Sequence, residues 1–275
     1  MLLWGTLGAI TLVEAPFFYI IGRANVNHKA NQHYSVALEE YARENFTRLK
    51  LEEGMPGVDD SHPKLQFTGL GRSTNHNRYG ACGLYNRDKG TITINLECAA
   101  NAEQGLLAKL KREISDDSRA NLEGTIRHEL AHSHNQGNID RLMNEIPLAY
   151  FKDPDALDID SALFRAISIQ LLNEGIATYK GGLSVDRHGY VNFDESVSFG
   201  INSFLPLDPL ENRIYYTLGF GLVKPIIDRY GQDGINYLWK NPPTPKDLMR
   251  PFSYQQRMLD ELAGISPVQS HPISK

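Results

Sequence analysis

Two histidines and a glutamate stand at a spacing that allows metal chemistry, in the segment HELAH at residues 128–132. Residues four apart lie on the same face of a helix, so His128 and His132 can bind one metal ion together. Glu129 lies next to them and could polarise a metal-bound water. This combination is typical of zinc sites that hydrolyse amide bonds. The alternative is an exposed polar helix face that carries the same residues without a metal.

A second carboxylate, Glu174, lies in the otherwise apolar segment LLNEGIATY at residues 171–179. An uncompensated buried carboxylate is costly, so a nearby cation would explain it. HELAH followed by NEGIATY resembles the gluzincin zinc metallopeptidases, and in particular their smaller peptidase-MA-like domains. That resemblance implies one zinc ion per chain, bound by His128, His132 and Glu174. It also implies that Glu129 activates a zinc-bound water for the hydrolysis of peptide bonds.

The resemblance extends to two further segments. YYTLG at residues 215–219 is similar to the Tyr-x-x-Gly segment of the zinc aminopeptidases. This similarity implies that Tyr216 donates a hydrogen bond to the oxyanion of the tetrahedral intermediate. Tyr215 is the fallback, and ordinary helix packing is the alternative for either tyrosine. The strand at residues 91–96 looks like the edge strand by which the family binds an extended peptide.

One rival to Glu174 lies nearer to the histidines. Glu145 follows an asparagine, as Glu174 does, and could supply the third ligand instead. Pro147 disfavours a helix that continues past this point, so Glu174 remains the expected ligand. The interval between His132 and Glu174 is longer than in the better-known gluzincins, which suggests an inserted loop around residues 146–160.

The helix that carries HELAH is predicted over residues 118–134. Leu122, Ile126 and Leu130 form its apolar stripe, and Ser118 can cap its first turn.

Strands precede most helices along the chain. Short strands are predicted at residues 65–70, 79–85 and 90–96, the last two facing each other across a turn. Further helices are predicted at 30–49, 103–114, 161–180, 210–230, 231–240 and 254–262. This order indicates an α+β fold. We expect a zincin-like domain at residues 64–275, in which a small antiparallel sheet with an edge strand is followed by a helical bundle carrying the zinc site. A helical arm and connector would form residues 23–63.

The apolar segment at residues 1–22 has nearly the length that spans a bilayer, and Glu14 is its only charged residue. We therefore expect a membrane-associated protein attached through this segment. A cleaved signal peptide and a helix packed on the protein itself are the alternatives. Arg23 and Lys29 follow the segment and weakly favour a cytoplasmic position for the remainder, which leaves the side of the membrane open.

The composition, with 41% hydrophobic and 22% charged residues, is that of a globular protein. A net charge of −5 and the lack of a Lys/Arg block give no reason to expect a nucleic-acid partner. The expected partner is a peptide or protein substrate. Cys82 and Cys98 are expected to be free, partly buried thiols, with a single bridge between them as the alternative.

Two other functions would use the same residues. A catalytically silent zinc-site domain would bind peptides without cleaving them, although Glu129 is present. A zinc hydrolase of a non-peptide amide or ester would rely on the same metal chemistry.

Overall fold

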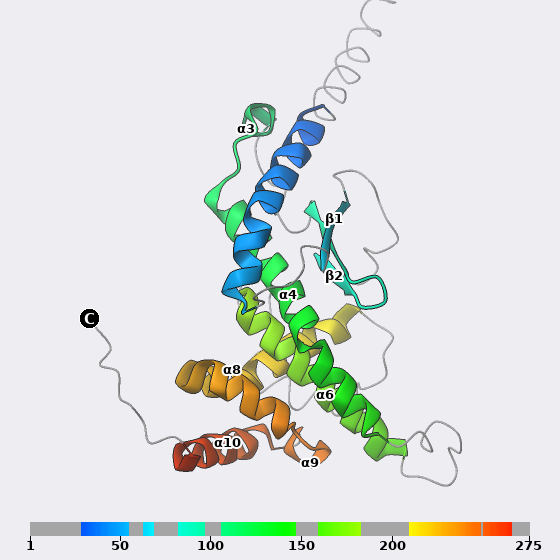
Figure 1. Ribbon diagram of the computed structural model, residues 1–275, viewed down its shortest axis with the longest axis vertical. Helices are drawn as coiled ribbons and strands as arrows, with labels where there is room; N and C mark the ends of the chain where they lie inside the picture. The colour runs from blue at the N-terminus through cyan, green and yellow to red at the C-terminus, as the bar shows by residue number, and fades with distance from the viewer. Residues whose placement is uncertain are drawn as a thin grey trace, which may run out of the picture.

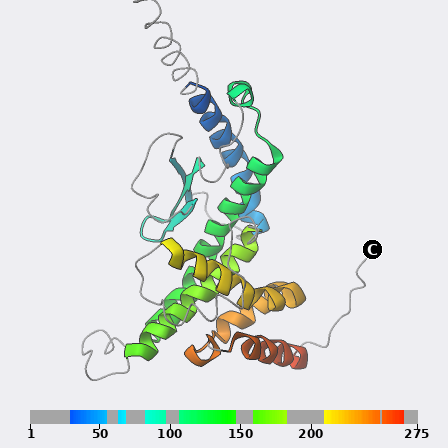
Figure 2. The same cartoon turned by 180° about the vertical axis from the view of Figure 1, so that it is seen from behind.

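The computed structural model describes residues 29–54, 63–68, 82–96, 106–146, 159–182, 209–248 and 250–265. Most of this part is helical, and a small three-stranded sheet lies on one side of the helices (Figures 1 and 2). The predicted α+β class is confirmed.

The described helices are the leading helix (residues 29–52), α3 (Leu106–Lys111), α4 (Asp116–Asn144), α6 (Ile159–Gly181), α8 (Pro209–Lys240), α9 (Pro245–Leu248) and α10 (Pro251–Ile265). The strands are β1 (Lys64–Thr68), β2 (Gly83–Asn86) and β3 (Thr91–Asn95). Every helix predicted from hydrophobic spacing is present, with its ends shifted. The two helices predicted on either side of position 231 form one element, α8, broken at Gly231 with φ of 54°.

The sheet differs from the prediction in one of its two strand pairs. Its order is β1-β3-β2, so β3 is the central strand and not the expected edge strand. β2 and β3 are antiparallel, with Asn86 opposite Thr91 across the predicted turn, but β1 runs parallel to β3. A short turn forces the antiparallel pairing, whereas the longer interval after Thr68 permits either direction.

Helix α4 is longer than predicted and begins earlier. Its N-cap is Ser115, whose hydroxyl accepts a hydrogen bond from the Ser118 backbone N–H at 3.2 Å. Ser118, the predicted cap, lies inside the first turn and is buried. Serine is a favoured N-cap residue, and both serines lie near the start of the helix. In the structure the N-cap is Ser115, three residues before the predicted one.

Two apolar cores hold the elements together. The first joins the leading helix, the sheet and the start of α4 through the buried side chains of Tyr34, Leu38, Ala42, Leu49, Ile92, Ile94, Leu96, Leu122, Ile126 and Leu130. The second joins the end of α4 to α6, α8 and α10. The predicted stripe of α4 therefore faces the first core, and the leading helix shares that core with the sheet.

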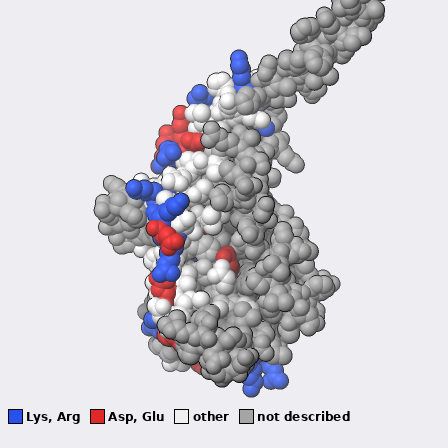
Figure 3. Space-filling model, turned by 90° about the vertical axis from the view of Figure 1, so that its right-hand side faces the viewer, with Lys and Arg blue, Asp and Glu red and all other residues white. Residues whose placement is uncertain are grey.

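Charged side chains of both signs are interspersed along one side of the face in Figure 3. Ion pairs such as Arg48–Glu52 and Arg87–Asp140 are largely exposed. Exposed pairs contribute little to stability, so the apolar cores are the main source of stability in the described part.

The segment expected to bind a membrane, residues 1–22, lies outside the described residues. Among the helices that the structure describes, none is long and apolar enough to cross a bilayer.

Cys82 is disulfide-bonded, so the expectation of a free thiol there is wrong. The only other cysteine of the chain is Cys98. Cys82 directly precedes β2, and its carbonyl accepts a hydrogen bond from the Asn95 backbone N–H at 2.8 Å. Cys82 is partly buried, and a cysteine in such a place has the same sequence signature whether it is free or bonded, which is why composition favoured the wrong state.

We expect Cys82→Ser to lower the free energy of unfolding by about 3 kcal/mol, because the bond closes a loop of roughly 15 residues. Chemical denaturation measures this loss. Cys98→Ser and the double variant should lower the free energy of unfolding by no more than Cys82→Ser does. Alkylation of both cysteines in the folded, unreduced protein would contradict the bond.

Candidate functional site

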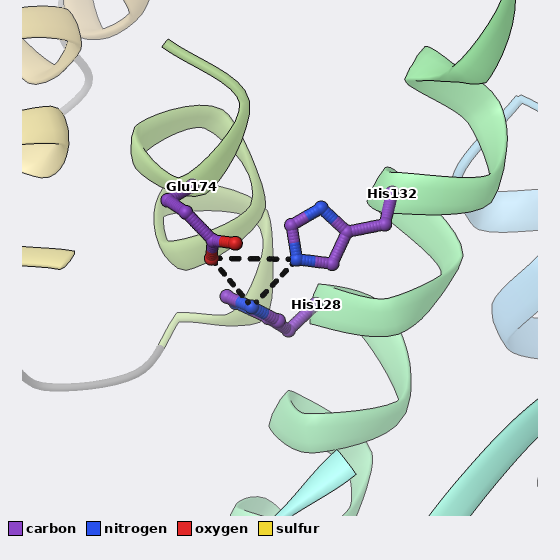
Figure 4. Close-up of side chains that lie close together, drawn as sticks. All are labelled: His128, His132 and Glu174. Carbon is purple, nitrogen blue, oxygen red and sulfur yellow. Dashed lines mark hydrogen bonds and ion pairs between the residues drawn. The ribbon is translucent and has the colours of Figure 1, made fainter. Parts of the chain in front are cut away.

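Three side chains converge between helices α4 and α6 (Figure 4). His128 and His132 lie one turn apart on α4, and their Nε2 atoms are 3.0 Å from each other. The Oε2 atom of Glu174, on α6, lies 3.4 Å from each of these nitrogen atoms. The structure thus brings together the three residues that the sequence indicated. In the part of the chain that is described, no other group of His, Cys, Asp or Glu is arranged to hold a metal ion.

The three atoms fit a metal ion in type and spacing. Two imidazole nitrogens and a carboxylate oxygen bind catalytic zinc in many proteins, at about 2.0–2.1 Å. Atoms at the corners of a tetrahedron around such bonds lie roughly 3.3 Å apart. The observed separations of 3.0 and 3.4 Å are close to this value. Glu174 Oε2 is also buried, and apart from the two imidazole nitrogens 3.4 Å away it has no hydrogen-bond partner among the described residues. The arrangement can therefore hold a metal ion.

Burial and mutual attraction set the charges of this group. Burial tends to raise the pKa of the Glu174 carboxyl, but the facing imidazoles outweigh it and hold that pKa well below its usual range. Burial tends to lower the pKa of His132, but the charge of Glu174 outweighs it and raises that pKa to about 9. Glu174 is thus ionised and favours a positive charge between the imidazoles, which a metal cation can supply.

Side chains that the sequence did not single out surround the ligands. Gln170 lies one turn before Glu174 and donates a hydrogen bond from Nε2 to Glu174 Oε1 at 2.8 Å, which leaves Oε2 to face the imidazoles. The side chain of Asn173 forms a hydrogen bond with His132, which raises the pKa of His132. Asn135, on α4, donates a hydrogen bond to Asn173 at 3.4 Å. Asn173 directly precedes Glu174 in the sequence. That position could have predicted its place beside the candidate ligands.

Glu129 lies on the side of α4 that faces β2. The residue is 5% exposed, and its carboxylate accepts a hydrogen bond from the Tyr85 backbone N–H. Gly83 touches the same side chain, because a Cβ at this position would lie 2.6 Å from Glu129 Oε1. Burial raises the pKa of the Glu129 carboxyl, although the neighbouring imidazoles oppose this. A larger residue at position 83 would displace the carboxylate from its place beside the ligands.

Tyr216, on α8, lies next to His128. The centroid of its ring is 5.6 Å from that of His128, with the two rings tilted by 57°. This position is compatible with the role that the resemblance implies for Tyr216, which stays a prediction. The side chain of Tyr215 lies outside what the structure describes.

The rival ligand Glu145 lies well away from this group. It follows His132 by about 20 Å along α4, at a rise of 1.5 Å per residue. It is the C-cap residue of α4 and forms ion pairs with Arg141 at 3.3 Å and with Arg165 at 2.9 Å. The loop expected around residues 146–160 falls almost entirely outside the described residues.

A buried anion ties the two ligand-bearing helices together. Glu53 follows the leading helix, and its side chain is 6% exposed. It pairs with Arg127 on α4 at 3.2 Å and with Lys180 on α6 at 3.1 Å. Arg127 directly precedes His128. The leading helix therefore helps to fix the separation of α4 and α6, on which the ligand geometry depends.

No protein-family model, curated protein or solved structure matches this chain.

Removal of a ligand should weaken zinc binding more than the 10–100-fold that is typical for partners of ligands. We therefore expect His132→Ala and Glu174→Ala each to weaken zinc affinity by more than about 100-fold, as measured by competition with a chromogenic chelator. Glu145→Ala is the matched control and should bind zinc as the wild type does. The reverse order of Glu174→Ala and Glu145→Ala would contradict the assignment.

Proposed function

We propose that this protein is a zinc-dependent peptidase of the gluzincin, peptidase-MA-like type, with a zincin-like catalytic domain. The observation that carries the proposal is the convergence of the three ligand residues beside a buried carboxylate, Glu129. Structural zinc sites are usually closed by four protein ligands, whereas catalytic sites keep a position open. Among the described residues, no fourth His, Cys, Asp or Glu joins the group. The site therefore favours catalysis over a purely structural role.

The side chains around the site have separate roles in the proposed reaction. When bound, zinc supplies a Lewis acid for a water molecule and the scissile carbonyl. Glu129 takes the proton of the attacking water and passes it to the leaving amine. Tyr216 donates a hydrogen bond to the carbonyl oxygen as negative charge develops on it. Gln170 keeps one oxygen of Glu174 directed at the histidines.

The outer edge of β2 pairs with no further strand among the described residues, and this edge favours a peptide over a small amide or ester as substrate. Along an antiparallel ladder, residue pairs that exchange backbone hydrogen bonds alternate with pairs that do not. Cys82 and Asn95 form a hydrogen-bonded pair, so the next pair, Gly83 with Ile94, is not hydrogen-bonded. The backbone groups of Gly83 and of Tyr85 therefore point away from β3. Tyr85 directs its N–H at Glu129, which places this edge beside the site. We propose that an extended peptide pairs by strand addition with the other outward backbone groups of β2, because the Tyr85 N–H is already bonded to Glu129.

Two assays separate the proposal from its rivals. Cleavage of a mixed peptide library, suppressed by a chelator and restored by zinc, supports the peptidase. Binding of peptides without cleavage favours the silent zinc-site domain. Turnover of small amides or esters alone favours a non-peptide hydrolase.

The disulfide at Cys82 favours an oxidising compartment, because such bonds are rare in the cytosol. We propose that residues 1–22 attach the protein to a membrane and that the catalytic domain lies on its outer side. Digestion of the domain by protease added to intact cells would support this position. Protection of the domain when protease reaches the oxidising side of that membrane but not its cytosolic side would contradict it.

The role of Glu129 is tested by Glu129→Gln, which keeps the size of the side chain but removes the proton acceptor. Peptide cleavage should fall by at least about 100-fold, in the range that general-base catalysis contributes. Zinc content should stay near that of the wild type, because Glu129 is not among the ligand residues. Both quantities are measured on the same preparation.

Glu123→Gln, the same change elsewhere on α4, is the control. Glu123 pairs with Arg48 on the leading helix at 2.9 Å and should be replaceable without loss of rate. A Glu129→Gln variant that holds zinc and cleaves at the wild-type rate leaves Glu129 without a catalytic role.

A further inference from the structure

Helices α6 and α8 cross at two glycines with their backbones in direct contact. A Cβ at Gly175 would lie 2.2 Å from the carbonyl oxygen of Gly219. A Cβ at Gly219 would lie 2.3 Å from the carbonyl oxygen of Leu171 and 2.8 Å from the Gly175 nitrogen. No side chain fits in either place. In Figures 1 and 2 the first part of α8, in yellow, crosses α6 where α6 lies beside α4.

Each glycine has a functional residue close to it in the sequence. Gly175 directly follows Glu174, the third ligand residue. Gly219 follows Tyr216 by three residues, so both lie on the same side of α8 about one turn apart. The crossing therefore determines how far the ring of Tyr216 lies from the ligands, including the 5.6 Å between its ring and that of His128.

We propose that Gly175 and Gly219 are positioning residues, which bring Tyr216 to the metal ligands by allowing the backbones of α6 and α8 to touch. Glycine inside a helix costs about 0.5–1 kcal/mol relative to alanine. Gly175 and Gly219 lie opposite each other inside their helices. The close contact of the α6 and α8 backbones, which no other residue type permits, offsets that cost. The proposal rests on the role proposed above for Tyr216.

Gly219→Ala tests the geometry without reference to catalysis. The added Cβ must push the two backbones apart by roughly 1 Å to reach an ordinary contact distance. The ring of Tyr216 would move with α8, and the NMR resonances of the His128 ring protons, which lie beside that ring, should shift. The full chain loaded with zinc and labelled at histidine is used for this measurement.

Gly234→Ala is the matched control. Gly234 is a buried glycine of the same helix, and its Cβ would lie 2.9 Å from the Ile226 carbonyl oxygen of α8 itself. The substitution therefore strains α8 without pressing on α6. It should leave the His128 resonances in place and the rate of peptide cleavage near that of the wild type.

The kinetic arm uses a double-mutant cycle. A displacement of about 1 Å at a catalytic group can cost up to about 100-fold in rate. We expect Gly219→Ala to lower kcat by about 10- to 100-fold with little change in KM and with zinc retained. Tyr216→Phe should lower kcat by at least about 100-fold in the wild type. In the Gly219→Ala background the same change should cost no more than about 10-fold, because the hydroxyl is already misplaced.

Each outcome decides one of the two claims. If the wild type cleaves nothing, the proposed function fails, but the shift of the His128 resonances still decides the geometry. Unchanged resonances and an unchanged rate in Gly219→Ala overturn the inference, as do fully additive effects of Gly219→Ala and Tyr216→Phe. If Gly219→Ala does not fold, Gly175→Ala presses on the same contact from α6. A missing nuclear Overhauser effect between the rings of His128 and Tyr216 in the wild type would also overturn it.

Discussion

A carboxylate with little solvent exposure, Glu174, faces two imidazoles across a helix–helix contact, and its charge must be compensated there. The compensation depends on the separations of these atoms, 3.0 and 3.4 Å, being right to within a few tenths of an ångström, because three atoms can share one cation only if they meet at the right distance. The two helices that carry these atoms are accordingly held together near the site. Glu53 bridges them through Arg127 and Lys180, and the Asn135–Asn173 hydrogen bond joins them again.

Glycine allows backbone to approach the site from two other directions. Gly83 lets β2 lie against the buried carboxylate of Glu129, and the Gly175–Gly219 crossing lets α8 lie against α6. Both contacts bring a group of proposed function close to the candidate ligands: the outward backbone of β2 in one case and the Tyr216 ring in the other. The disulfide at Cys82 lies directly before this strand and restricts its position further.

The parts of this arrangement that are local in sequence could be predicted. Two histidines four residues apart share a helix face whatever the rest of the fold does, and the turn after Asn86 makes a hairpin of the strands on either side. The parallel direction of β1, the central place of β3 and the contact between Gly83 and Glu129 depend on partners far apart in the chain, and the spacing of residues does not encode them. Glu174 lies between these cases, because its carboxylate in an apolar segment indicated a cation without indicating where the cation would lie.

The central claim is that His128, His132 and Glu174 together bind one zinc ion, and X-ray absorption spectroscopy at the zinc edge tests it most directly. The zinc-loaded protein should show two imidazole nitrogens and carboxylate or water oxygens at about 2.0–2.1 Å, and no sulfur. The imidazole contribution should fall to one in His132→Ala if any zinc remains bound. A shell that contains sulfur at about 2.3 Å, or oxygen alone, would contradict the account.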